Sequence, residues 1–181
     1  MAYKKAKQYR LPGYNYSSND AYFVTIVCLN RNCFFGTISD GEMKLSEIGK
    51  IIKLELLMAI EYKQDIQIPK FVIMPNHVHL LIELQNEQLT EKSPASILPL
   101  GPGFERKGHI GPLQKGSLGS FVNHFKGRVT RKCKKLGFID FAWQSRYHDR
   151  IVRGEKEYNR IVDYIESNIA DWEDDNENLE V

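Results

Sequence analysis

The apolar positions of the chain follow two periods, which predicts a mixture of strands and amphipathic helices. Residues 21–30 are β-branched and aromatic with no breaker, as in a buried strand. Across 45–62, apolar residues recur every three to four positions, which predicts a helix. Residues 66–74 and 77–84 have the composition of two more strands, and the short Pro-Asn connection between them predicts an antiparallel hairpin.

The second half of the chain adds two helices and one short strand. Ser117 is a suitable N-cap for a helix of about five turns that ends near Gly137. A short strand is predicted around 150–152, and a last helix over 155–169. The predicted order, strand, helix, strand, strand, helix, strand, helix, is that of a ferredoxin-like α+β sandwich: an antiparallel sheet with helices packed on one face.

The length of 181 residues suits one domain. We expect residues 1–20 to form a flexible lead-in and 21–170 to form the folded domain. Within that domain, 85–115 is rich in proline and glycine and lacks periodicity, which predicts a long exposed loop. Residues 171–181 are expected to form an acidic tail.

The composition argues against a membrane protein, a secreted protein and a cysteine-based fold. No apolar run approaches the ~20 residues that span a bilayer, so a membrane location is not expected. No apolar stretch follows the basic N-terminus, so we expect no secretory signal and a cytoplasmic location. The three cysteines form no CxxC pair, which argues against a thiolate zinc site and against a disulfide framework.

Charge is distributed unevenly, although the net charge is only +2. Residues 106–160 hold 14 basic and 4 acidic residues, a local charge of +10, whereas 161–181 hold 8 acidic residues and no Lys or Arg. A basic block of this density favours a polyanion such as nucleic acid as the partner. A solvated lysine-rich face is the simpler explanation of charge alone, so the charge needs support from a motif.

Two histidines begin the predicted strand 77–84. Because side chains alternate along a strand, His77 and His79 point to one face, ~6–7 Å apart along the chain, and Val78 points into the core. Two imidazoles so placed suit one Zn²⁺, Mn²⁺, Ni²⁺ or Fe²⁺ ion. An isolated His-x-His is more often a pair of surface or hydrogen-bonded histidines, so this pair needs a partner residue.

The last predicted helix offers that partner. On a helical wheel, the apolar stripe that must face the sheet comprises Tyr158, Ile161, Val162, Ile165, Ile169 and Trp172. Tyr164 lies off the centre of this stripe, and Asn168 lies beside it one turn further on. From this flank, both side chains could reach a site on the sheet. Taken alone, Tyr164 has the pattern of an ordinary surface tyrosine.

Three segments, in this order, carry a resemblance to a known family. They are YFVTIV from Tyr22, VIMPNHVHLLI from Val72, and WQSRYHDRI from Trp143 followed by YNRIVDYIESN up to Asn168. Together they resemble the HUH (His-hydrophobic-His) single-tyrosine transposases, and in particular the REP-associated tyrosine transposases. The resemblance extends over about residues 9–170, and its motifs in correct order are far more specific than any one of them.

This resemblance implies a role for each matched position. His77, His79 and Asn168 would hold a divalent metal ion, Mg²⁺ or Mn²⁺, and Tyr164 would be the nucleophile. The domain 21–170 would be a catalytic domain that cleaves and rejoins single-stranded, hairpin (REP-type) DNA through a 5′-phosphotyrosine intermediate. The basic side chains suited to contact phosphates are Lys126, Arg128, Arg131, Lys132, Lys134, Lys135, Arg146, Arg150 and Arg153.

Three other functions are compatible with parts of this pattern. One is a relaxase-like nickase, which shares the HUH chemistry. Another is a non-catalytic module that stacks single-stranded bases on its sheet, for which Tyr22 and Phe23 are the available aromatics. The third is a domesticated transposase that only binds DNA repeats. The sequence leaves open whether the protein acts as a monomer or a homodimer, and whether Tyr164 serves the metal site of its own chain.

Overall fold

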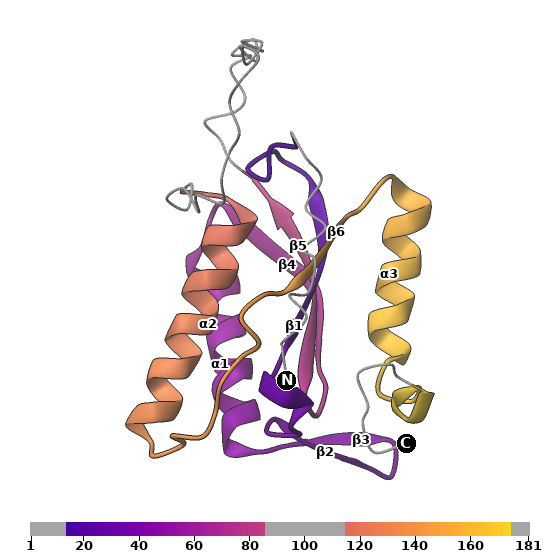
Figure 1. The fold of residues 1–181 in the computed structure, drawn as a ribbon. Coiled ribbons are helices and arrows are strands. Elements are labelled where there is room, and N and C mark those ends of the chain that lie inside the picture. Colours follow the sequence, from indigo (N-terminus) through magenta and orange to yellow (C-terminus); the bar gives the residue numbers. More distant parts are fainter. Residues whose placement is uncertain (1–13, 86–114, 175–181) are drawn as a thin grey trace, which may run out of the picture.

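The computed structural model describes residues 14–85 and 115–174, and within them four strands form the main sheet (Figure 1). The sheet is antiparallel, in the order β4-β5-β1-β6. The strands are β1 (Ala21–Val27), β2 (Gly36–Ser39), β3 (Glu42–Leu45), β4 (Ile66–Ile73), β5 (His77–Leu84) and β6 (His148–Ile151). The helices are η1 (Leu29–Arg31), α1 (Glu47–Tyr62), α2 (Leu118–Lys135), α3 (Glu155–Ser167) and η3 (Trp172–Asp174). The α+β class and the β4–β5 hairpin are as predicted.

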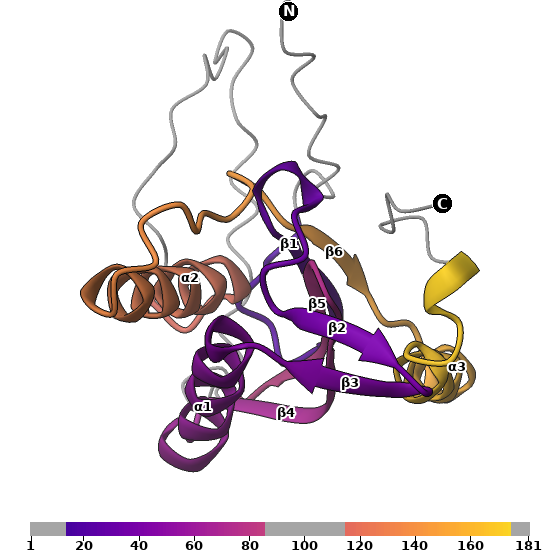
Figure 2. The same cartoon turned by 90° about the horizontal axis from the view of Figure 1, so that it is seen from below.

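The helices cover both faces of the sheet, which corrects the expectation of helices on one face. Figures 1 and 2 show α1 and α2 together on one side and α3 on the other. One apolar cluster joins α1 and α2 to residues such as Val24 and Val78, and a second joins Ile161 and Ile165 of α3 to Leu81. The physical reason lies in β5, which is apolar at successive positions. A strand buried on both sides needs a cover on both.

The wheel prediction for the last helix is confirmed. Ile161, Ile165 and Trp172 are buried in the second cluster, and Tyr158, Val162 and Ile169 pack against it. Tyr164 lies outside this cluster and 42% of its surface is exposed. The helix therefore holds its apolar stripe on the sheet and leaves Tyr164 at its flank.

A small second sheet, in which β2 pairs with β3, was not predicted. Asp40 and Gly41, in the turn between these two strands, have φ of 56° and 73°, the left-handed conformation of a tight hairpin turn. The hairpin runs beneath the end of the main sheet (Figure 2). Ile38 packs on the cluster under α3, while Met43 packs on the cluster under α1 and α2. Its strands have four residues each, too short to give a clear period.

The helix termini follow from local sequence. Ser46 caps α1 by accepting from the N–H of Gly49, and Ser117 caps α2 by accepting from the N–H of Ser120, as predicted for Ser117. Gly137, just beyond α2, has φ 90°, a conformation that glycine adopts without strain. Among the described helices, none is long and apolar enough to cross a membrane.

Parts of the predicted organisation lie outside the described residues. These are 1–13 of the expected lead-in, nearly all of the loop expected over 85–115, and 175–181 of the expected acidic tail. Of the lead-in, Tyr14 and Tyr16 are described, and their rings contact Tyr22 of β1 at centroid distances of 6.5 and 6.0 Å.

Candidate active site

The two histidines of β5 lie side by side on the α3 face of the sheet. His77 is fully buried and His79 is 4% exposed, while Val78 between them lies in the opposite cluster, as predicted. The Nε2 atoms of the two imidazoles are 2.9 Å apart, and their ring centroids are 4.4 Å apart. Two ring nitrogens therefore converge on one point at the surface of the sheet.

A hydrogen bond at the far nitrogen of each ring sets which nitrogen faces that point. Nδ1 of His77 is 2.8 Å from Oδ1 of Asn76, and Nδ1 of His79 is 2.9 Å from the hydroxyl of Thr25. An amide oxygen only accepts, so Nδ1 of His77 carries the proton and donates it. Nε2 of His77 then presents a lone pair. The Thr25 hydroxyl can accept from the same tautomer of His79, in which both Nε2 atoms would present lone pairs to a metal ion.

Burial keeps the His77 ring neutral, as a metal ligand must be. Burial, followed by the nearby positive charge of Arg31, lowers the pKa of His77 from 6.5 to about 3. A neutral imidazole at neutral pH is ready to bind a cation without first losing a proton.

Tyr164 approaches the histidines from α3. Its hydroxyl lies 3.3 Å from Nε2 of His79, and its ring contacts the His79 ring at a centroid distance of 5.3 Å. Phe23 of β1 stacks on His79 and meets Tyr164 edge-on, at 5.1 and 5.8 Å. These contacts hold the phenol beside the paired nitrogens while part of the ring faces solvent.

Asn168 lies one turn beyond Tyr164, and Trp172 lies four residues beyond Asn168. The ring centroids of Trp172 and His77 are 6.1 Å apart, and Tyr164 contacts His79. Asn168 therefore lies between two residues of the same flank that each contact one of the histidines. Asn168 is 2% exposed, and its Oδ1 has no hydrogen-bond partner among the described residues. A buried, unpaired amide oxygen is costly unless a ligand satisfies it.

These residues fit a divalent metal ion. The donor set would be two imidazole nitrogens and one amide oxygen, a neutral set that suits Mn²⁺ or Mg²⁺ beside a phosphate. Within the described ranges, no group of three His, Cys, Asp or Glu side chains offers another metal site. The unpaired Oδ1 of Asn168 is the observation that favours a third ligand here.

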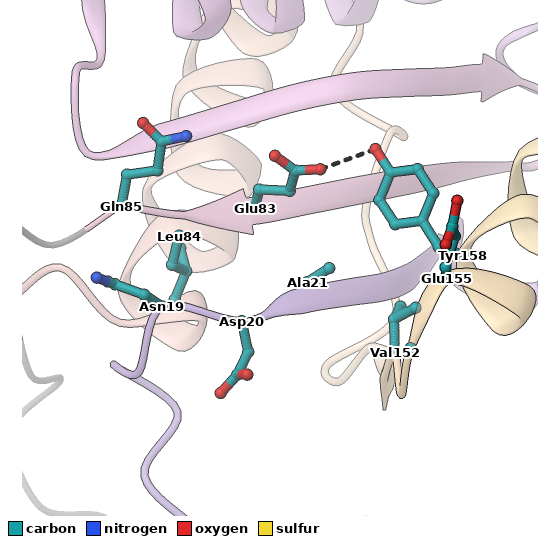
Figure 3. Close-up of a pocket in the computed structure, with 10 residues that line it drawn as sticks. Asn19, Asp20, Ala21, Glu83, Leu84, Gln85, Val152, Glu155 and Tyr158 are labelled. Carbon is teal, nitrogen blue, oxygen red and sulfur yellow. Dashed lines mark hydrogen bonds between the residues drawn. The ribbon is translucent and has the colours of Figure 1, made fainter.

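Tyr158, the other tyrosine of α3, has a different environment. It lines a pocket of about 550 Å³ at the far end of the sheet, together with Asp20, Glu83 and Glu155 (Figure 3). Its hydroxyl donates to Glu83 at 2.7 Å. Burial, followed by the hydrogen bond to this carboxylate, raises the pKa of Tyr158 to about 12. Tyr158 therefore lies at the opposite end of β5 from His77 and His79.

Three of the basic residues expected to contact DNA have partners within the protein. Arg128 and Lys132 of α2 both bind the buried carboxylate of Glu55 on α1, each at 2.5 Å. Lys126 donates to the backbone oxygens of Gln144 and Arg146. Helix α2 also lies on the opposite side of the sheet from α3, the helix that carries Tyr164 (Figure 1). These three side chains thus join α2 to α1 and to the loop before β6.

The remaining predicted DNA contacts are more accessible. Arg131, Lys134, Lys135 and Arg146 are exposed. Arg150 on β6 is paired with Glu157 at 2.5 Å, and its side chain is 70% exposed. Its register partner on β1 is Phe23, so Arg150 lies on the sheet face that carries the histidines.

The sequence did not reveal the residues that orient the site. Thr25 and Asn76 lie inside the matched segments. The sequence does not indicate, however, which side chain a polar residue in a strand or turn will bind. Tyr22, named above as a base-stacking aromatic, is fully buried between the sheet and its first two helices. Phe23 is partly exposed and contacts the rings of His79 and Tyr164. Burial therefore makes Tyr22 unavailable for base stacking, whereas Phe23 keeps part of its surface accessible.

No protein-family model matches the chain. An "Uncharacterized protein" of Haemophilus influenzae is 36% identical over 166 residues, which covers 92% of this chain and 89% of that protein. A solved structure of a REP-associated tyrosine transposase bound to a REP hairpin superposes with a TM-score of 0.60, at 18% identity, over 92% of this chain and 74% of that one. The chain therefore has that fold. A putative transposase from Deinococcus radiodurans gives a TM-score of 0.46 at 18% identity, over 90% and 97% of the two chains.

Proposed function

We propose that this chain, which belongs to one family with the Haemophilus influenzae protein, is a metal-dependent tyrosine transposase that cleaves and rejoins single-stranded DNA. Its substrate class is a DNA hairpin of REP type with single-stranded flanks. The chain shares its fold with a transposase whose structure holds such a hairpin, and the proposal extends that substrate to this protein.

One observation carries this proposal: a phenol, two neutral imidazoles and an unpaired amide oxygen converge in one place. The hydroxyl of Tyr164 is 3.3 Å from Nε2 of His79, in the same chain. A surface tyrosine without a function has no reason to lie against a buried histidine pair. The convergence also favours attack by Tyr164 at the site of its own chain.

The expected reaction is a transesterification. The oxygen of Tyr164 loses its proton to solvent and forms a bond to the scissile phosphorus. The bond between phosphorus and the 3′ oxygen breaks, and that oxygen leaves with the bonding pair and takes a proton from solvent. The DNA downstream is then joined through its 5′ phosphate to Tyr164, and the upstream strand ends in a free 3′-OH. Attack by another 3′-OH reverses these steps and gives strand transfer without ATP.

Each residue has a defined part in this reaction. A divalent ion held by His77, His79 and Asn168 would polarise the phosphate and stabilise the charge that develops on it. Helix α3 holds the phenol in position, which lowers the entropy cost of attack. A phenol has a pKa of about 10 and needs such help at neutral pH. The neutral ligand set brings no negative charge toward the phosphate.

Covalent capture tests the proposal directly. A hairpin oligonucleotide with single-stranded flanks, labelled at its 3′ end, is incubated with the protein and Mn²⁺, and the mixture is run on a denaturing gel. We expect a protein–DNA adduct that carries the 3′ label, and an upstream fragment that a polymerase can extend from its 3′-OH. Tyr164→Phe should form no adduct, whereas Tyr158→Phe, the matched control on the same helix, should form it normally.

Two outcomes would contradict the proposal. An adduct that persists in Tyr164→Phe would exclude this nucleophile, and no adduct with the unaltered protein would exclude the reaction. Mixing a chain that lacks His77 with one that lacks Tyr164 separates attack within a chain from attack between chains. Adduct formation in the mixture, with neither variant active alone, requires an exchange of active-site residues between two copies.

A further inference from the structure

The chain leaves β1 through a turn with an unusual backbone. Two successive residues in it, Asn30 and Arg31, have φ of 58° and 55°, in the left-handed region. Asparagine adopts this region fairly readily, but a side chain such as arginine rarely does. Among the described residues other than glycine, only Asp40 in the β2–β3 hairpin turn shares it. Strained backbone conformations are concentrated at functional sites, so the conformation of Arg31 points to a function for this residue.

Hydrogen bonds connect this turn to Asn76, the residue before strand β5, which carries the histidines. The side-chain amide of Asn76 donates through Nδ2 to the backbone oxygen of Arg31 at 3.1 Å. Its Oδ1 accepts from His77 at 2.8 Å, so one buried side chain fixes both the Arg31 backbone and the first histidine. The N–H of Cys28 also donates to the backbone oxygen of Asn76 at 2.8 Å. The turn and the histidine pair therefore form one rigid unit.

Arg31 is the least exposed residue of this turn. Residues 29, 30, 32 and 33 are exposed, whereas Arg31 between them is partly buried. The Asn76 amide that holds its backbone oxygen also binds His77, so Arg31 lies next to the histidine pair. A cation placed near a ligand that is meant to hold another cation weakens that site electrostatically. This repulsion would be relieved if an anion lay between the Arg31 guanidinium and the metal ion during the reaction.

We infer that Arg31 is a further catalytic residue, whose guanidinium binds the non-bridging oxygens of the scissile phosphate and stabilises the charge that builds up there as Tyr164 attacks. This inference rests on the proposed function. A planar guanidinium offers paired donors that match two phosphate oxygens, and it stays charged at any pH of interest. The left-handed backbone would aim it at the phosphate in advance.

The alternative is that the turn serves only to reverse the chain. Two substitutions separate the explanations. Arg31→Gly keeps the left-handed backbone available and removes only the side chain, so the fold should be retained, with a melting temperature unchanged or higher. Asn30→Gly is the matched control: it makes the same change in the same turn and keeps Arg31.

The measurement is the rate of adduct formation with the labelled hairpin and Mn²⁺. We expect Arg31→Gly to lower this rate by about 100-fold or more and Asn30→Gly to leave it unchanged. Mn²⁺ affinity, measured by calorimetry without DNA, should not fall in Arg31→Gly, because the arginine does not bind the metal. Guanidinium ion at millimolar concentration should restore part of the lost rate, whereas sodium at the same ionic strength should not.

The possible outcomes separate this inference from the proposed function. If the unaltered protein forms the adduct and Arg31→Gly forms it as fast, the role of Arg31 is excluded and the proposed reaction stands. A slow Arg31→Gly that binds Mn²⁺ more weakly, or that guanidinium does not rescue, would assign the residue to structure instead. If the unaltered protein forms no adduct, both proposals fail.

Discussion

Oδ1 of Asn76 accepts a hydrogen bond from Nδ1 of His77, the next residue, at 2.8 Å. This contact leaves Nε2 of His77 facing Nε2 of His79 across 2.9 Å. The buried amide, rather than the histidine itself, thus decides which ring nitrogen can bind a metal ion.

The first prediction concerns this amide. Asn76→Ala should weaken Mn²⁺ binding by about 10–100-fold, because His77 loses the acceptor that fixes its tautomer and its orientation. Isothermal titration calorimetry of the full chain measures the affinity. Asn32→Ala, at an exposed asparagine near the same turn, should bind Mn²⁺ normally. Equal affinities in the two variants would contradict the role assigned to Asn76.

The second prediction concerns the ion cluster between α1 and α2. Burial alone would raise the pKa of Glu55, but hydrogen bonds from Lys132 and Arg128 and their charges hold it below its ordinary value. Glu55→Gln should lower the free energy of unfolding at pH 7 by about 2 kcal/mol. The loss is smaller than that from breaking a fully buried ion pair, because the side chains of Arg128 and Lys132 are partly exposed. Urea denaturation measures this change.

The pH dependence of that stability has a definite sign. Because the folded pKa of Glu55 lies below the unfolded one, its contribution is present above about pH 4.5 and is lost as the pH falls through the folded pKa. The difference between the unaltered protein and Glu55→Gln should therefore shrink in acid. Glu47→Gln, at an exposed pair with Lys50, should change stability very little at either pH. A constant difference from pH 7 to pH 3 would contradict the assignment.

The third prediction concerns His77 in the metal-free protein. Burial, followed by the charge of Arg31, lowers the pKa of His77 to about 3. Below pH 6.5, His77 therefore becomes protonated in the unfolded chain but stays neutral in the folded chain. The free energy of unfolding should fall by about 2 kcal/mol between pH 7 and pH 5 from this residue. His77→Asn should lack this component. NMR should detect no titration of the His77 ring near pH 6.5, and a titration there would refute the prediction.

The fourth prediction separates structural from DNA-binding cations on α2. Burial lowers the pKa of Lys126 to about 8, and its ammonium donates to two backbone oxygens. Lys126→Gln should therefore lower the melting temperature and leave the salt dependence of DNA binding unchanged. Arg131→Gln, at an exposed position, should leave the melting temperature unchanged and reduce the slope of log K against log salt by about one. The reverse pattern would reassign both residues.

Much of the fold could be predicted because its signals are local. The period of apolar residues located the strands and helices, and Ser117 located the start of α2. Residues 80–82 of β5 are apolar at successive positions, which indicates burial on both faces, but the prediction placed helices on one face only. The β2–β3 hairpin was missed because four-residue strands carry almost no period.

By itself, the sequence determined which side chains are available for chemistry: a histidine pair on one face of a strand, and Tyr164 with Asn168 on one flank of a helix. Only the tertiary structure decided which of them meet. Tyr164 and His79 are 85 residues apart in the chain, Thr25 and His79 are 54 apart, and Glu55 and Arg128 are 73 apart. Periodicity reports only which face a side chain takes on its own element. The partner across the gap depends on how the elements pack, and that packing removed Tyr158, Arg128 and Lys132 from the set of free groups while it brought Thr25 and Arg31 to the site.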